Sequence, residues 1–172
     1  MQIFYSDSFV LPLPPGHRFP MQKYALQRER VAAARLVPPE RLQLPPAASD
    51  HELARAHSPA YLHRCQTGQL IAQELRRIGF PWSPAMIERS RRSAGATIAA
   101  CRAALAGEVG VNLAGGTHHA FADYGAGYCV FNDSAVAARA MQAEGHAQRV
   151  LILDCDVHQG DGTAAILADD PC

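Results

Sequence analysis

Side chains that bind metals and move protons follow an apolar run near the carboxyl end of the chain. Residues 150–162 read VLILDCDVHQGDG and contain Asp154, Asp156, His158 and Asp161. Ionised carboxylates at the end of a buried run are costly to desolvate unless a cation or a hydrogen-bond donor pairs with them. The segment therefore indicates a metal site, a set of acid–base residues, or both.

Asp156 and His158 have a spacing that suits two ligands of one metal ion. Side chains at positions i and i+2 of an extended segment share a face, about 6.5–7 Å apart. From there both could reach a cation at the ~2.0–2.2 Å of Zn–O and Zn–N bonds. Asp154 lies deeper on that face, and Asp161 follows Gly160, where the chain can turn back. Because imidazoles in such sites commonly need a carboxylate partner, these two aspartates suit nearby histidines.

A second polar pair, His118 and His119, follows the apolar run at residues 109–116. Ligands of open α/β sheets bind beyond the carboxyl ends of the strands, so the two motifs converge on one crevice if the two runs are neighbouring strands. Each motif alone has an ordinary structural explanation, because strand-end aspartates often cap helices and paired histidines often lie at the surface. The two motifs together indicate function.

The elements that would position these residues alternate between strands and helices. Apolar or β-branched runs predict strands at residues 2–6, 42–46, 109–116 and 149–156. Periodic segments with capping residues predict helices at 21–36, from Ser49 or Asp50, from Ser58 with Pro59, from Ser83 with Pro84 to Gly107, and from Asn132 or Asp133 to about Gly145. This order predicts an α/β fold of three layers, α/β/α, with a mostly parallel sheet.

Size and composition narrow the classes of function. A chain of 172 residues favours one domain, and 16 basic residues balance 16 acidic ones. Without a basic stripe or many aromatic residues, nucleic acid is not an expected partner. No apolar run approaches the roughly 20 residues of a membrane span, and the first residues do not resemble a signal peptide. The five scattered cysteines are expected to be reduced thiols, which favours a cytoplasmic location.

Three stretches, NLAGGTHHAF, GAGYCVFND and RVLILDCDVHQGDGT, together resemble the zinc-dependent histone deacetylase superfamily, whose fold is that of the arginases and deacetylases. The resemblance is dense over residues 112–163 and weaker over AHSPAYLHRC and the N-terminal strand. GHRFPMQKY is similar to the class IV-like and bacterial branch. Where the class I pattern has an arginine six residues after its loop histidine, this chain has Lys23 after His17.

The resemblance implies a role for each polar residue of the site. His118 and His119 match the tandem catalytic histidines, with Asp154 as the partner of His118 and Asp161 as the partner of His119. His119 would take the proton of the attacking water, and a protonated histidine would then donate to the leaving amine. The implied enzyme is a deacetylase, a hydrolase of linear amide bonds.

The implied metal set is incomplete. Asp156 and His158 match two of the three zinc ligands of the superfamily, for which Fe²⁺ is an alternative ion, and the backbone of residues 154–158 resembles its structural potassium site. The third ligand, an aspartate, and the tyrosine that stabilises the oxyanion are expected beyond Cys172. Residues 1–172 are therefore expected to be the N-terminal part of a single catalytic domain, truncated at its C-terminal side and inactive alone.

The resemblance also implies a substrate, an acylated lysine peptide or another acyl-amine. Gly127 matches the residue whose carbonyl accepts the substrate amide N–H, and Tyr128 lies where a phenylalanine usually lines the acyl-lysine tunnel. Pro81 and Trp82 are either part of the tunnel rim or ordinary loop packing. Outside the site, three histidines are expected to be structural or exposed: His51, His57 and His63.

Three other functions remain open. One is hydrolysis of acetylpolyamines or other small acyl-amides, which the rim of the site would decide. A second is a truncated chain that binds metal without catalysis. The third is the arginase relative with two manganese ions, whose D-x-H-x-D motif is interrupted here because Gly160 has no ligand atom.

Overall fold

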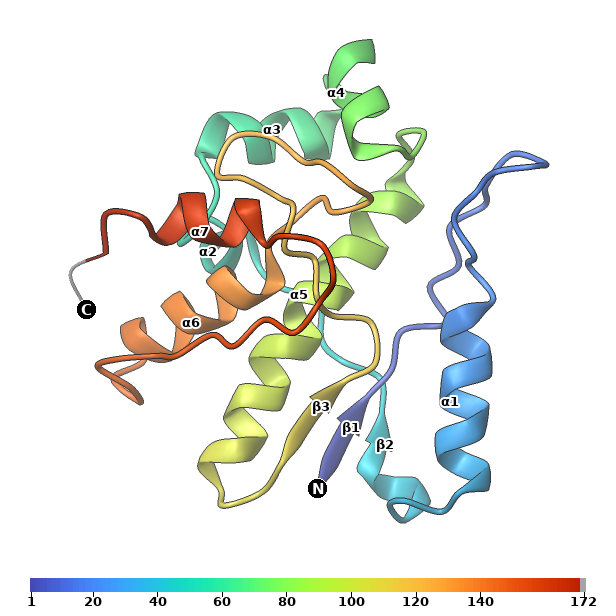
Figure 1. The fold of residues 1–172 in the computed structure, drawn as a ribbon, viewed down its shortest axis with the longest axis vertical. Helices are drawn as coiled ribbons and strands as arrows, with labels where there is room; N and C mark the ends of the chain where they lie inside the picture. Colours follow the sequence, from blue (N-terminus) through green and yellow to red (C-terminus); the bar gives the residue numbers. More distant parts are fainter. Residues whose placement is uncertain (171–172) are drawn as a thin grey trace.

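The computed structural model describes residues 1–170, and Figure 1 shows their arrangement. Three short strands form a sheet: β1 (Gln2–Phe4), β2 (Leu42–Gln43) and β3 (Gly110–Asn112). The helices are α1 (Lys23–Ala33), α2 (Asp50–Leu53), α3 (Pro59–Thr67), α4 (Ala72–Ile78), α5 (Pro84–Leu105), α6 (Asp133–Ala143) and α7 (Asp161–Leu167), with a 3-10 turn at Pro39–Arg41. No helix within residues 1–170 combines the length and the apolar character that crossing a membrane requires.

The sheet is parallel, with strand order β2-β1-β3. Ile3 of the central strand is in register with Leu42 on one side and with Val111 on the other. Each neighbour of β1 is reached by a helical crossover, as parallel pairing requires. The predicted parallel sheet and its first three strands are confirmed, although each strand is shorter than its apolar run.

Helices cover both faces of this sheet. Phe4 packs with Ala96 and Ala100 of α5 on one face. Because side chains alternate along a strand, the next residue, Tyr5, faces the opposite side, where the guanidinium carbon of Arg28 on α1 lies 5.5 Å from its ring centroid. The α/β/α arrangement predicted from the order of the elements is therefore confirmed.

The predicted helix starts are confirmed where a hydroxyl or amide side chain caps the first turn. Ser49 and Glu52 form a capping box at α2. Ser58 and Ser83 accept hydrogen bonds from the first turns of α3 and α5, each with proline at the first helical position, and Asn132 accepts from the first turn of α6. Such caps satisfy backbone N–H groups that have no partner within the helix.

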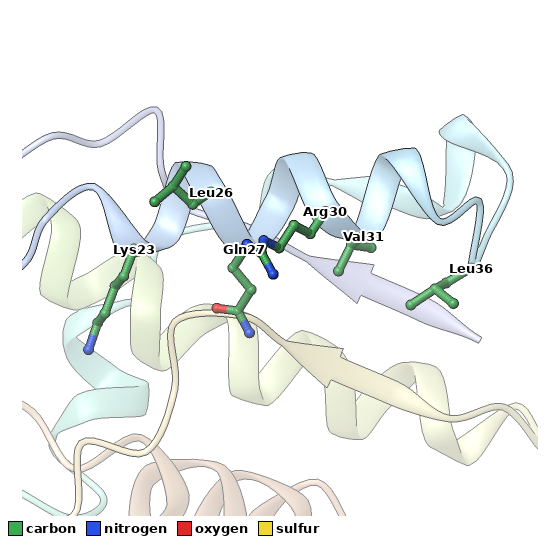
Figure 2. A pocket seen from close by; sticks show the side chains of 6 residues that line it. All are labelled: Lys23, Leu26, Gln27, Arg30, Val31 and Leu36. Carbon is green, nitrogen blue, oxygen red and sulfur yellow. The ribbon is translucent and has the colours of Figure 1, made fainter.

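Helix α1 lies on one face of the sheet, and none of its residues is buried. A hollow of about 440 Å³ lies along α1 and the segment that follows it, and Figure 2 shows the side chains of Lys23, Leu26, Gln27, Arg30, Val31 and Leu36 that line it. Leu26 is 54% exposed and Leu36 60%. Apart from Lys23, this hollow contains no residue that also lines the cavity beside the tandem histidines.

The prediction of a fourth strand at residues 149–156 is wrong. The segment joins no sheet among residues 1–170, and β3 pairs only with β1. Leu151 and Leu153 are 89% and 81% exposed, so the run is not buried either. An extended segment becomes a strand only when a neighbour accepts its backbone hydrogen bonds, and the described residues supply none. The idea that the two apolar runs are adjacent strands is therefore also wrong.

Candidate active site

Two histidine–aspartate pairs form the centre of the site. His118 Nδ1 lies 2.7 Å from Asp154 Oδ2, and His119 Nδ1 lies 2.7 Å from Asp161 Oδ1. The centroids of the two imidazole rings are 4.3 Å apart. The pairs join residues far apart in the chain, so the convergence expected from the sequence is present even though the two runs are not neighbouring strands.

In both pairs the aspartate is the hydrogen-bond acceptor and the histidine is the donor. The hydrogen bond with His118 lowers the pKa of Asp154, and the hydrogen bond with His119 lowers the pKa of Asp161. An ionised carboxylate accepts only, so each imidazole donates from Nδ1. Nε2 of each ring is then left as the nitrogen that can accept or donate a proton.

Asp156 and His158 lie beside these pairs. Asp156 Oδ1 is 2.9 Å from His158 Nδ1 and also accepts from the His158 backbone N–H at 2.8 Å. The pKa of Asp156 is lowered by these hydrogen bonds. At 2.9 Å the two candidate donor atoms are slightly closer together than two ligands of one tetrahedral zinc, which lie about 3.3 Å apart for bonds of 2.0–2.1 Å. Their chemistry and separation fit a shared metal.

The protein ligands of such a metal are incomplete among the described residues. Residues 1–170 contain no group of three histidine, cysteine, aspartate or glutamate side chains placed to hold one ion. A catalytic zinc normally has three protein ligands and one open position. Asp156 and His158 therefore fit as two members of a larger set.

Asp133 holds the loop that carries the tandem histidines, a role that its expected function as a helix cap did not reveal. Its carboxylate is buried and accepts from the backbone N–H groups of Gly116 and Thr117 and from the hydroxyls of Thr97 and Thr117. A Cβ at Gly115 would lie 2.7 Å from Asp133 Oδ2, so only glycine fits there. The paired glycines before the histidines thus let the loop close around a buried carboxylate.

Asn132 connects the histidine loop to α7, a helix that the sequence did not predict. Its fully buried side chain donates from Nδ2 to the carbonyl of Ala120 and to the hydroxyl of Thr163, each at 3.0 Å, while Oδ1 caps α6. The Thr163 backbone N–H also donates to the His118 carbonyl. These bonds place Asp161, the first residue of α7, against His119.

His57 is structural, as expected. It is 2% exposed, lies 3.0 Å from the Phe121 carbonyl through Nδ1, and accepts from the Asn132 backbone N–H through Nε2. Because Nε2 accepts, the proton is on Nδ1. Burial lowers the pKa of His57 to about 4, so the ring is neutral at physiological pH. His51 is exposed, and the exposed His63 lies on α3.

A cavity of about 410 Å³ contains the tandem histidines and the candidate metal ligands. Gly127 and Tyr128 also line it, which places the expected substrate-binding residues beside the expected catalytic ones. Both have left-handed backbone conformations, with φ of +54° for Gly127 and 66° for Tyr128. Tyr128 belongs to an aromatic cluster at the cavity wall. Its ring centroid lies 4.9 Å from that of Phe19 and 5.1 Å from that of Phe80.

Trp82 does not line this cavity. Its indole N–H donates to the Cys65 carbonyl at 2.7 Å, and its ring lies over Gly68. Loop packing is therefore the correct explanation for this residue. Four cysteines are free thiols, as expected, and Cys172 lies outside the described residues.

Comparisons with known proteins identify the family of this chain. The model of the histone deacetylase domain family matches residues 17–172. An uncharacterized protein of Picosynechococcus is 43% identical over 98% of this chain and 56% of its own length. A histone deacetylase-like amidohydrolase of Pseudomonas aeruginosa is 40% identical over 73% of this chain and 34% of its own length.

A crystal structure of an HDAC homolog complexed with SAHA superposes with a TM-score of 0.82 at 26% identity, over 96% of this chain and 47% of that chain. This chain thus spans between about a third and just over half of the length of these three relatives. The chain belongs to the histone deacetylase domain family.

Proposed function

We propose that the protein is a zinc-dependent hydrolase of acyl-lysine or related acyl-amine amide bonds. The observation that carries the proposal is the pairing of each tandem histidine with its own carboxylate at 2.7 Å, in a cavity that also contains Asp156 and His158. Family membership supports amide hydrolysis in general. Zinc, with Fe²⁺ as the alternative ion, and acyl-lysine as the substrate are the finer parts of the proposal.

Each residue of the site has a step to perform. Asp161 holds the His119 ring so that Nε2 can take a proton from the attacking water, and Asp154 holds His118 in the same way. A protonated imidazole then gives its proton to the leaving amine, because an amine leaves poorly as an anion. The Gly127 carbonyl accepts the substrate amide N–H, and the Tyr128 ring lines the acyl-lysine tunnel.

Asp156 and His158 would hold the metal. When bound, zinc would polarise the acyl carbonyl and lower the pKa of a coordinated water. Since two protein ligands are fewer than a catalytic zinc needs, we propose that residues 1–172 are the N-terminal part of one deacetylase catalytic domain. A potassium ion at the backbone of residues 154–158 stays a prediction from the resemblance.

The test is hydrolysis of acetyl-lysine peptides by the full-length protein, before and after complete removal of metal with a chelator. Loss of turnover on chelation and recovery with Zn²⁺ are expected. Asp156→Ala and His158→Ala should abolish turnover and metal uptake together, whereas His51→Ala, a change at an exposed histidine, should alter neither. Turnover that persists in the metal-free protein would contradict the proposal.

Acetylpolyamines remain a second substrate class, and the same assay with N-acetylated diamines distinguishes them. The isolated 172-residue chain should show no hydrolysis, because it lacks the third ligand and the oxyanion donor expected beyond Cys172. Loss of one such donor typically lowers rates by about 10²–10³. Robust turnover by the isolated chain would show that these residues suffice and that the truncation proposal is wrong.

A further inference from the structure

Arg89 on α5 is a nearly buried cation without a charged partner among residues 1–170. Its residue surface is 6% exposed. Among residues 1–170, Arg89 Nη2 and Ser6 Oγ are the only buried side-chain nitrogen or oxygen atoms that lack a hydrogen-bond partner. Arginine stays protonated in proteins, so this guanidinium brings a positive charge into the interior. Buried charges are normally paired, which makes the lack of a partner informative.

Within the described part of the chain, the Arg89 charge is stabilised only by contacts with aromatic rings. Its guanidinium carbon lies 4.4 Å from the Tyr24 ring centroid and 5.9 Å from the Phe19 centroid. A ring face attracts a cation but accepts no strong hydrogen bond, so the N–H donors keep their capacity for an anion.

This unpaired cation faces the active site. Arg89 lines the 410 Å³ cavity that also contains His118, His119 and the candidate metal ligands. Lys23 lines it as well, and its Nζ lies 4.8 Å from the same Phe19 ring. The one aspartate that lines this cavity, Asp156, is bonded to His158. The part of the cavity near Phe19 and Tyr24 is therefore positive and has unused hydrogen-bond donors.

We infer that Arg89 binds a carboxylate inside this cavity, and that the site therefore favours acyl groups that end in a carboxylate, such as succinyl or glutaryl. The planar guanidinium matches a carboxylate with two parallel hydrogen bonds, which a lysine or a neutral donor does not reproduce. An acyl chain whose carbonyl lies at the tandem histidines occupies the same cavity as Arg89. The inference rests on the proposed amide hydrolysis for the identity of the substrate, but carboxylate binding does not depend on turnover.

The experiment measures binding by NMR titration of the metal-free full-length protein, so it does not depend on catalysis. The ligands are N-butylsuccinamic acid and N-butylpropanamide, which differ only in the terminal carboxylate. The wild-type protein should bind the acid at least about tenfold more tightly, as one charged hydrogen-bonded pair predicts. Arg89→Met should remove this preference, and Arg89→Lys should retain only part of it.

Arg76→Met is the matched control, because Arg76 is exposed on α4 and outside the cavity. It removes the same charge from the surface and should leave the preference unchanged. Thermal unfolding of each variant shows whether it is folded. If Arg89→Met does not fold, the comparison of Arg89→Lys with the wild type still tests the bidentate contact.

Acetate is added as a third ligand. It distinguishes a subsite for the terminal carboxylate of an acyl group from a subsite for the carboxylate of the product acid. Weak binding of acetate beside tight binding of N-butylsuccinamic acid supports an acyl group with a terminal carboxylate. If acetate binds as tightly as the acid and depends on Arg89, the subsite takes the product acid and the substrate preference is overturned. Equal binding of all ligands to wild type and Arg89→Met would overturn the carboxylate site altogether, whatever the result of the hydrolysis assay.

Discussion

Gly127 lies directly against His119: a Cβ added to the glycine would come within 2.7 Å of the imidazole Cδ2. Gly127 has a φ of +54° and is followed by Tyr128, another residue with a positive φ. Two left-handed residues in succession are rare, and such strain tends to persist at functional sites. The turn therefore packs against the ring of the proposed general base, which Asp161 also holds through a hydrogen bond.

Gly127→Ala is expected to displace His119 and lower hydrolysis by about 10²-fold, because proton transfer depends on placement of the ring. The matched control is Gly145→Ala, which shares a positive φ of +74° but has no atom within 4 Å of the added Cβ. Both variants should lose about 1–2 kcal/mol of stability from the left-handed backbone. Equal activity of the two would show that contact with His119 is unimportant.

The two histidines should differ in importance. Single alanine variants of the full-length enzyme should both be impaired, with His119→Ala more strongly reduced, since general base catalysis commonly contributes about 10²–10⁴ in rate. The assignment follows from the family pattern and from the contact between His119 and Asp161. Rates of hydrolysis under saturating substrate give the comparison, and a larger loss for His118→Ala would exchange the assigned roles.

Removing the Asp133 carboxylate should destabilise the protein through the histidine loop. Asp133→Ala leaves the N–H groups of Gly116 and Thr117 without their acceptor, at a cost of about 2–4 kcal/mol. Chemical denaturation measures the loss, and hydrolysis should fall as well because the same loop carries the tandem histidines. Asp123→Ala, at an exposed residue, is the control. A stability equal to wild type would show that the carboxylate is dispensable.

Acid should destabilise the fold through His57. The native pKa is lowered from 6.5 to about 4 by burial, so the unfolded state binds the proton first as pH falls. The contribution is complete above pH 6.5 and is lost progressively down to pH 4, amounting to about 2–3 kcal/mol. Urea unfolding of wild type and His57→Gln at several pH values should give a flatter profile for the variant.

His51→Gln changes an exposed histidine and should keep the wild-type pH profile. Carboxylates with lowered pKa also lose stabilising interactions in acid, but they do so at lower pH and equally in both proteins. A parallel shift of the His57→Gln curve, without a change in slope between pH 6.5 and 4, would contradict the role of this histidine.

The exposed apolar run should make the isolated chain of residues 1–172 associate. Leu151 and Leu153 are 89% and 81% exposed on an extended segment that has no strand partner among residues 1–170. Such surfaces pair with other chains. Size-exclusion chromatography with light scattering should show oligomers, and the double variant Leu151→Lys, Leu153→Lys should be closer to monomeric. A monomeric wild-type chain at high concentration would refute the expectation.

Much of the outer architecture follows from local sequence. Ser58 and Ser83, each followed by a proline, predict helix starts because a hydroxyl caps free N–H groups and proline loses nothing at the first helical position. Type and spacing also mark Asp156 with His158 as a candidate ligand pair, and His118 with His119 as a second polar pair. The individual roles of these residues, and the choice of Gly127 and Tyr128, come from the resemblance to the deacetylase superfamily. These features depend on neighbours within a few residues, and the sequence contains them in full.

Tertiary structure decided which groups meet. The apolar pattern of residues 149–156 predicts a buried strand, but a strand also needs a partner, and no local pattern specifies one. Asp133 reads as a helix cap, yet its carboxylate binds a loop about 16 residues earlier in the chain. The sequence shows Arg89 as one of several arginines on a helix. Only the packing of Phe19 and Tyr24 around it leaves its charge buried and, within the part of the chain that the structure describes, unpaired. Contacts between distant segments depend on the path of the whole chain, so they are determined only when the chain has folded.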